Sequence, residues 1–221
     1  MLNFTFYNPT KIIFGRETIK DIAAEIPQGA KILITCGGDS ARRYGVLSEV
    51  RAALQDFAVW EFSGIEPNPT YETLLRAVRD AQDRHIDFLL AVGGGSVIDG
   101  AKFIAAAAHH PGDPWDIVAS HGGGVSRTIP LGTVLTLPAT GSEMNCAAVI
   151  TRRSLNAKLA FSSQHVFPRF SVLDPTKTFS LPPRQIANGA VDAFVHVTEQ
   201  YLTYPVNAAV QDRYAEGLLQ T

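Results

Sequence analysis

The 221-residue chain has little cysteine, no excess of positive charge and no long apolar run. Its two cysteines, Cys36 and Cys146, lie far apart and outside any C-x-x-C spacing, which argues against a disulfide framework and against a cysteine-ligated zinc site. The formal net charge of -2 lacks the strong positive field that binding to a phosphate backbone requires. We therefore expect no nucleic-acid partner.

Membrane and export signals are also lacking. Apolar stretches such as Phe103 to Ala108 are too short to cross a bilayer. The first six residues have neither the basic start nor the apolar core of a signal peptide. Hydrophobic residues make up 46% of the chain, which is enough apolar surface for a core. We expect a globular cytoplasmic protein with no membrane partner.

Short apolar segments alternate with amphipathic ones along most of the chain. The segments 31–35, 59–62, 88–92, 133–137 and 170–173 have the length and β-branched content of buried strands. Helical patterns lie between them at about 17–26, 46–55, 70–84 and 96–108. This order predicts an α/β fold with a doubly wound parallel sheet, in which ligands bind beyond the carboxyl ends of the strands.

The composition changes at Ser180-Leu-Pro-Pro183. Prolines suit the first turn of a helix, because no intrahelical hydrogen-bond donor is lost there. From Pro183 onward we expect one helix to about Thr203, a break at Pro205 and another helix from about Val206 to the end. The sequence thus predicts an α/β domain at residues 1–179, followed at residues 180–221 by the first helices of a helical domain.

A triple glycine follows the expected strand 88–92. The turn Gly93-Gly-Gly-Ser96 precedes a helix, and glycines there let the backbone approach a ligand while the free amides of the helix start favour an anion such as pyrophosphate. Alternatively, the glycines only permit a tight turn, and Asp99 and Lys102 form an exposed i,i+3 pair. Because Ile98 and Ala101 stand where a glycine and a lysine would be needed, neither an ordinary Rossmann fingerprint nor a P-loop is present.

Two further polar loops follow expected strands. Gly37–Ser40 comes after strand 31–35, and Thr136–Glu143 brings threonines, a serine and an acid to the end of strand 133–137. Each loop alone is a weak signal, since turns are generally rich in such residues. Together they place three polar loops at strand ends, where a doubly wound sheet binds its ligand.

Polar residues form one line on an otherwise apolar helix in the last part of the chain. Asn188, Asp192 and His196 are spaced i, i+4, i+8 on one face. We expect this helix to be buried, and an acid and a histidine one turn apart can ligate the same divalent ion. The alternative is a structural Asp–His hydrogen bond in a helical core. Two ligands alone do not complete a catalytic site.

In this order, Gly93–Lys102, Thr136–Glu143 and Asp192–His196 closely resemble the corresponding segments of the iron-dependent, or group III, alcohol dehydrogenases. Other segments resemble the branch of NADPH-dependent aldehyde reductases and butanol dehydrogenases: Phe14-Gly15, Ile65–Pro69, Leu173–Pro175 and Leu181–Gln185. The resemblance extends over essentially the whole chain. It implies a dinucleotide-binding α/β domain and an all-helical domain that holds Fe2+ or Zn2+.

The resemblance also implies the activity, a hydride transfer between a nicotinamide cofactor and a small alcohol or aldehyde, in a homodimer. Asp192 and His196 match the first two of four metal ligands and would act in catalysis through the metal, which polarises the substrate oxygen. The candidate cofactor-binding residues are Gly37, Gly38, Asp39, Ser40, Gly94, Gly95, Ser96, Asp99, Thr136, Thr140, Asn145 and Lys158. Asn145 and Phe161 are also candidates for the wall of the substrate pocket.

NADP(H) is the expected cofactor. An acid at the first position of the loop after strand 31–35 would repel a 2′-phosphate, whereas this chain has Gly37 there and Ser40, Arg42 and Arg43 nearby. Asp39 argues in the other direction, because a carboxylate near the phosphate weakens binding. NAD(H) therefore stays open.

Members of the family continue for nearly the same length again, and the two remaining histidine ligands lie in that part. We therefore expect a truncated product, a fragment or a partial gene model. A nucleotide-binding remnant without catalysis is one alternative. A lyase similar to dehydroquinate synthase, with NAD and a divalent metal, is another, but segments 136–143 and 192–196 fit the dehydrogenases better.

Overall fold

The computed structural model describes residues 3–203 and 207–221. The chain divides into two compact units, one ending at Phe179 and the other beginning at Ser180. The expected helix break at Pro205 lies outside the described residues. No helix in the described parts is both long enough and apolar enough to span a bilayer.

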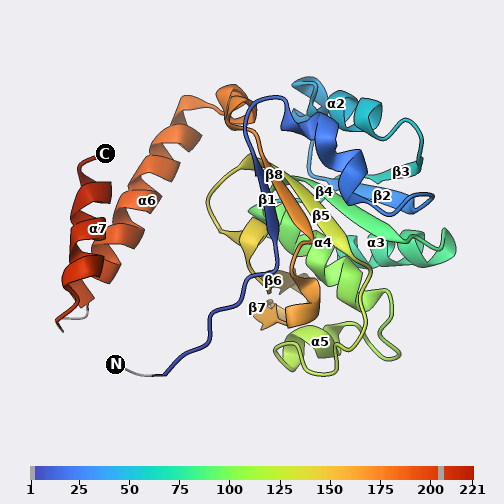
Figure 1. The fold of residues 1–221 in the computed structure, drawn as a ribbon. Coiled ribbons are helices and arrows are strands. Elements are labelled where there is room, and N and C mark those ends of the chain that lie inside the picture. Colours follow the sequence, from blue (N-terminus) through green and yellow to red (C-terminus); the bar gives the residue numbers. More distant parts are fainter. Residues whose placement is uncertain (1–2, 204–206) are drawn as a thin grey trace. The chain divides into compact units, whose positions relative to one another are not determined.

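The first unit is built on a six-stranded parallel sheet with the order β1-β8-β5-β4-β2-β3, which confirms the predicted α/β class (Figure 1). An antiparallel hairpin, β6–β7, stands apart from this sheet. The sheet strands are β1 (Lys11–Phe14), β2 (Lys31–Cys36), β3 (Ala58–Phe62), β4 (Phe88–Gly94), β5 (Leu131–Leu137) and β8 (Phe170–Leu173). The hairpin strands are β6 (Ala147–Arg152) and β7 (Ala157–Ser162).

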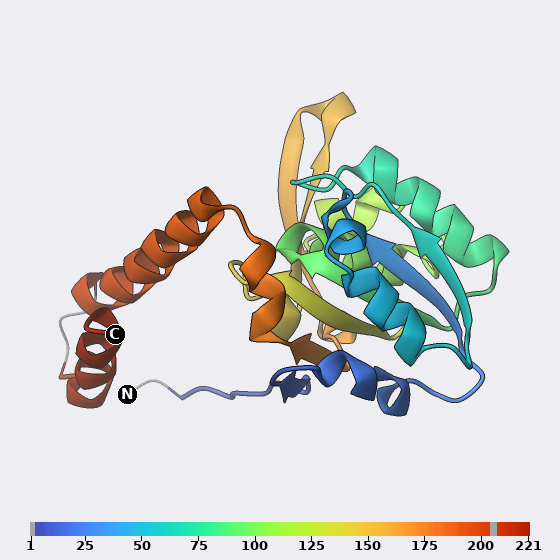
Figure 2. The same ribbon diagram turned by 90° about the horizontal axis from the view of Figure 1, so that it is seen from above.

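Helices cover both faces of the sheet (Figure 2). The α-helices are α1 (Ser40–Arg43), α2 (Val46–Ala53), α3 (Tyr71–Asp83), α4 (Gly95–Ala107) and α5 (Trp115–Ala119). The 3₁₀ segments are η1 (Thr18–Glu25), η2 (Ser142–Met144), η3 (Arg153–Leu155), η4 (Gln164–Val166) and η5 (Pro175–Ser180). The helix expected at 17–26 therefore forms the tighter 3₁₀ type.

Alternate side chains of the strands enter two separate cores, as the pleat requires. Leu33 and Leu89 point to the core shared with α3 and α4. Ile32 and Leu90 point to the core shared with η1 and α2. Because both faces are covered, the central strands are apolar throughout, which is why their sequences show runs and not alternation.

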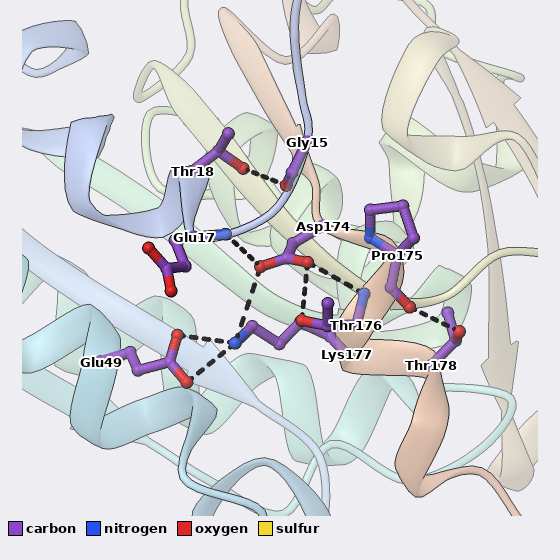
Figure 3. Close-up of polar contacts among 9 residues, drawn as sticks. All are labelled: Gly15, Glu17, Thr18, Glu49, Asp174, Pro175, Thr176, Lys177 and Thr178. Carbon is purple, nitrogen blue, oxygen red and sulfur yellow. Dashed lines mark hydrogen bonds and ion pairs between the residues drawn. The ribbon is translucent and has the colours of Figure 1, made fainter.

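A buried carboxylate holds the segment after β8 in place (Figure 3). The side chain of Asp174 is fully buried and accepts hydrogen bonds from the amide of Glu17 at 2.9 Å and from the amide and hydroxyl of Thr176 at 2.9 and 2.7 Å. Lys177 lies 3.7 Å from the same carboxylate and 2.7 Å from Glu49 on α2. These contacts tie η5 to both η1 and α2.

The second unit consists of α6 (Pro183–Thr203) and α7 (Ala209–Leu219). No residue of α6 is buried, so the prediction of a buried helix is wrong for this chain. Ile186, Val191 and Phe194 are each more than half exposed, at 55%, 63% and 56%. Among the described residues of this unit, only α7 is available to cover α6, and one helix covers only a narrow stripe of another.

Candidate functional site

The loops after β2 and β4 meet at the point where the strand order of the sheet reverses. From β2 the chain moves outward to β3, whereas from β4 it moves to β5 on the other side. In a doubly wound sheet this switch point is where a crevice opens at the carboxyl ends of the strands. The loop after β2 lies close to the first turn of helix α4 (Gly95–Ala107) there, since a Cβ on Gly37 would lie 3.5 Å from Cγ2 of Val97.

The glycine-rich turn lies between β4 and α4. Gly94 is the N-cap of α4 in an extended conformation, and no side chain caps this end of the helix. A Cβ on Gly93 would lie 2.6 Å from Val97, and one on Gly95 would lie 2.2 Å from Oγ1 of Thr140. The packing of the protein itself thus requires glycine at both positions. The uncapped helix start still provides amides and a positive dipole for an anion.

The loop after β5 forms the next wall. Leu137 pairs with Gly94 across the sheet, so Thr136 and Thr140 lie beside the glycine-rich turn. Thr140 is an exposed residue, and its hydroxyl oxygen accepts a hydrogen bond from the amide of Ser142 at 3.2 Å. Hydroxyls at this place can donate to a ligand that lies over the turn.

Asp99 and Lys102 do not form the exposed pair that the simpler alternative for the glycine turn supposed. Lys102 is completely buried, and Asp99 accepts hydrogen bonds from the hydroxyl of Ser142 at 2.6 Å and the amide of Val149 at 3.0 Å. Burial lowers the pKa of Lys102 to about 8 and raises the pKa of Asp99 above its usual value. Both oxygens of Asp99 therefore have partners within the protein.

Ser96 and Lys158 are joined through a residue that the sequence analysis did not single out. The amide of Asn68 donates to Oγ of Ser96 at 3.2 Å, and Oδ1 of Asn68 accepts from Nζ of Lys158 at 2.7 Å. Asn68 has a φ of 57°, a conformation that asparagine tolerates better than most residues. The sequence signal that could have indicated Asn68 is its position between two prolines, Pro67 and Pro69. Within the described residues the ammonium of Lys158 has no carboxylate partner, so its charge can serve an anion.

The loop Gly37–Ser40 is open to solvent at Gly38, where an added Cβ would meet nothing within 4 Å. Asp39 is exposed and makes no side-chain cap for α1. Arg42 pairs with Glu61 of β3, which Arg51 also contacts at 2.7 Å, and the guanidinium of Arg43 stacks on Tyr44. Of the two arginines expected near a 2′-phosphate, Arg42 is thus engaged by an acid.

The two candidates for the wall of the substrate pocket are both used by the protein. Oδ1 of Asn145 accepts hydrogen bonds from Lys102 and from the amide of Ala147, each at 2.9 Å. Phe161 is only 1% exposed and packs edge-on against Phe103 in the core, so its assignment to the pocket is wrong. Alternation along β7 directs this side chain inward.

The candidate metal ligands lie in the second unit. Nε2 of His196 is 3.5 Å from Oδ2 of Asp192, one turn apart on α6, and both side chains are at least half exposed. Within the described residues no cluster of three or more His, Cys, Asp or Glu side chains is suited to a metal ion. The pair can therefore supply two ligands of a larger site.

Comparison with known proteins identifies relatives along the whole chain. The family described as iron-containing alcohol dehydrogenase matches residues 9–175. The NADPH-dependent aldehyde reductase YqhD of Escherichia coli K12 is 56% identical over all of this chain and 58% of its own length. The NADP-dependent alcohol dehydrogenase 3 of Entamoeba histolytica is 45% identical, over 100% of this chain and 59% of its own length.

Solved structures of relatives have the same fold. A crystal structure of YqhD matches with a TM-score of 0.93 and 55% identity, over 97% of this chain and 56% of that one. The NADH-dependent butanol dehydrogenase A of Thermotoga maritima matches with a TM-score of 0.91 and 39% identity, over 99% of this chain and 55% of that one. The chain thus spans less than three fifths of the length of these relatives.

Proposed function

The chain belongs to the iron-containing alcohol dehydrogenase family, and we propose that its α/β unit binds a nicotinamide dinucleotide at the switch point of the sheet. The main support is the meeting of three polar loops there, Gly37–Ser40, Gly94–Ser96 and Thr136–Thr140. The pyrophosphate would lie at the uncapped start of α4, near Ser96 and the ammonium of Lys158. The exposed Thr140, the half-buried Thr136 and Asn68 would contact the rest of the cofactor.

We propose NADP(H) as the preferred cofactor. The absence of an acid at Gly37 and the presence of Ser40 and the exposed Arg43 favour a 2′-phosphate. Asp39 and the pairing of Arg42 with Glu61 weaken this preference. The relatives carry names with NADPH, NADP and NADH, so NAD(H) is the alternative.

A divalent metal, Fe2+ or Zn2+, would be held by Asp192 and His196 together with further ligands. An acid oxygen and an imidazole nitrogen on one helix face fit two positions of such a site. Bound there, the metal supplies a Lewis acid for the substrate oxygen. Because two ligands leave the site incomplete, we expect residues 1–221 alone to bind nucleotide more firmly than metal.

The proposed reaction is reduction of a small aldehyde to an alcohol and its reverse, in a homodimer. When bound, the reduced nicotinamide would supply the hydride for the carbonyl carbon, and the carbonyl oxygen would take up a proton to give the alcohol. The residues of this chain would contribute by fixing the nucleotide on the glycine-rich turn. The names of the relatives, aldehyde reductase and butanol dehydrogenase, support this substrate class.

Nucleotide titration of the purified chain tests the proposal. Binding of NADPH would be followed by the change in its fluorescence, with NADH as the comparison. We expect saturable binding of both and tighter binding of NADPH. Absence of binding by a folded chain would contradict the proposed site, whereas tighter NADH binding would contradict only the cofactor preference. NADPH oxidation with butanal, with and without added Fe2+ or Zn2+, then tests turnover.

A further inference from the structure

Lys102 lies in the middle of α4 with its side chain completely buried. Its ammonium donates hydrogen bonds to Oγ of Ser142 at 2.9 Å, Oδ1 of Asn145 at 2.9 Å and the carbonyl oxygen of Ala147 at 2.8 Å. An ammonium has three protons, so each one has an acceptor. A buried charge is unfavourable unless it is compensated in this way, and an apolar side chain of the same length would take one hydrogen-bond donor from each of the three acceptors.

All three acceptors belong to one segment, Ser142–Ala147, which follows the loop after β5. Asp99, one turn before Lys102, accepts from the hydroxyl of Ser142 and from the amide of Val149. Lys102 therefore holds both ends of this segment, and Asp99 of the same helix holds Ser142 and the following strand at Val149. We call Asp99, Lys102 and Ser142 the α4 clamp.

The α4 clamp is connected to the wall of the proposed nucleotide site. The amide of Ser142 donates to Oγ1 of Thr140 at 3.2 Å. The side chain of Thr140 in turn occupies the space over the first residue of α4, where a Cβ on Gly95 would lie 2.2 Å from Oγ1. A shift of Ser142 would consequently move Thr140 relative to the glycine-rich turn.

We infer that Lys102 is a positioning residue for the nucleotide site, because it holds Ser142–Ala147 so that Thr140 faces the glycine-rich turn. This inference rests on the proposed function. The ammonium is buried and its protons are all engaged by the protein, so Lys102 acts through Thr140 and not by contact with the cofactor. A purely structural lysine would instead change stability alone.

The test combines Lys102→Met with Thr140→Ala in a double-mutant cycle, measured as the Kd of NADPH on the 221-residue chain. Lys102→Met should raise the Kd about tenfold, the factor that corresponds to one lost interaction of 1.4 kcal/mol. Thr140→Ala should weaken binding in the wild-type background and have little further effect in Lys102→Met, because coupled residues are not additive. Ile22→Ala, in the core on the opposite face, controls for lost stability and should leave the Kd unchanged.

Several outcomes would overturn the inference. A folded Lys102→Met with unchanged Kd would do so, as would additive effects of the two substitutions or an equal loss of affinity in Ile22→Ala. Should Lys102→Met fail to fold, Ser142→Ala removes the hydroxyl through which Lys102 and Asp99 hold this residue, while the amide that donates to Thr140 remains. The loss of this anchor should raise the Kd several-fold; an unchanged Kd would again overturn the inference. Failure of the wild-type chain to bind NADPH would contradict the proposed function, and the inference with it.

Discussion

Replacement of Gly38 by alanine separates the needs of a ligand from the needs of packing. Gly38 is exposed, and an added Cβ would meet nothing within 4 Å. Its φ lies outside the left-handed region, so alanine fits without strain. The substitution should leave stability unchanged or raise it by about 0.4–1 kcal/mol, because alanine restricts the unfolded chain. Any loss of nucleotide affinity must then come from contact with the ligand.

Gly95→Ala is the contrasting variant. Its methyl group would lie 2.2 Å from Oγ1 and 2.6 Å from Cγ2 of Thr140, far inside van der Waals contact. Thr140 is at the exposed end of the loop and has to move, so we expect a loss of about 1–3 kcal/mol from overpacking. Gly112→Ala serves as the control, since its nearest neighbours would be at 3.5 and 3.6 Å and it lies away from the switch point.

The assay measures the Kd of NADPH by fluorescence and the free energy of unfolding in urea for all three variants. Gly38→Ala should raise the Kd about tenfold at undiminished stability, a change of 1.4 kcal/mol in binding. Gly95→Ala should lose both affinity and stability, and Gly112→Ala neither. If Gly38→Ala binds NADPH as tightly as the wild-type chain, the loop after β2 does not contact the cofactor and the assignment of Gly37–Ser40 is wrong.

Three other substitutions test the electrostatics. Asp39→Asn should raise the NADPH-to-NADH affinity ratio about fivefold, the effect of removing one exposed charge about 4 Å from a phosphate; an unchanged ratio would place Asp39 away from the 2′-phosphate. Burial tends to raise the pKa of Asp174, but hydrogen bonds from Thr176 and Glu17 and the charge of Lys177 outweigh it, so the net pKa is lowered. The stability that Asp174 provides is therefore present above its unfolded pKa and lost as the pH falls through its folded pKa. Asp174→Asn should lower the free energy of unfolding by about 2 kcal/mol at neutral pH and reduce this loss of stability in acid. Identical urea unfolding curves for the variant and the wild-type chain would refute this prediction. Burial lowers the pKa of Lys102 from 10.5 in the unfolded chain to about 8 in the folded protein. Between pH 8 and pH 10.5 the unfolded chain therefore binds more protons, and the free energy of unfolding should rise with pH. This rise should be absent from Lys102→Met.

Much of the fold follows from local signals in the sequence. The buried strands appear as apolar runs because both faces of the sheet are covered, and α6 begins at Pro183 and ends at Thr203 as predicted. The edge strand β1 was missed because it has only four residues, most of them exposed, and its apolar run of three residues, Ile12–Phe14, is too short to indicate a strand. The hairpin β6–β7 was missed for a different reason: its short strands are stabilised by packing on α4 and α5, which no local pattern records.

The site was predictable in outline and not in its internal contacts. The carboxyl ends of parallel strands lie at one edge of a sheet, so polar loops after β2, β4 and β5 had to come together. The burial of Lys102 was not predictable, because its three acceptors are 40 or more residues away in the sequence. An acid and a base at i,i+3 appear as a solvent-exposed pair until tertiary partners are known.

The glycines in the loop after β2 and in the turn after β4 satisfy different physical requirements. Gly93 and Gly95 are fixed by contacts with Val97 and Thr140, so they would be needed even without a ligand. Gly38 has no such neighbour and lies in the loop at the carboxyl end of the adjacent strand β2. A glycine that packing does not require, at the carboxyl end of a central strand, is thus a stronger indication of a close ligand than the more conspicuous triple glycine. The uncapped start of α4 adds the second requirement, because glycine provides access while the helix amides provide attraction for an anion.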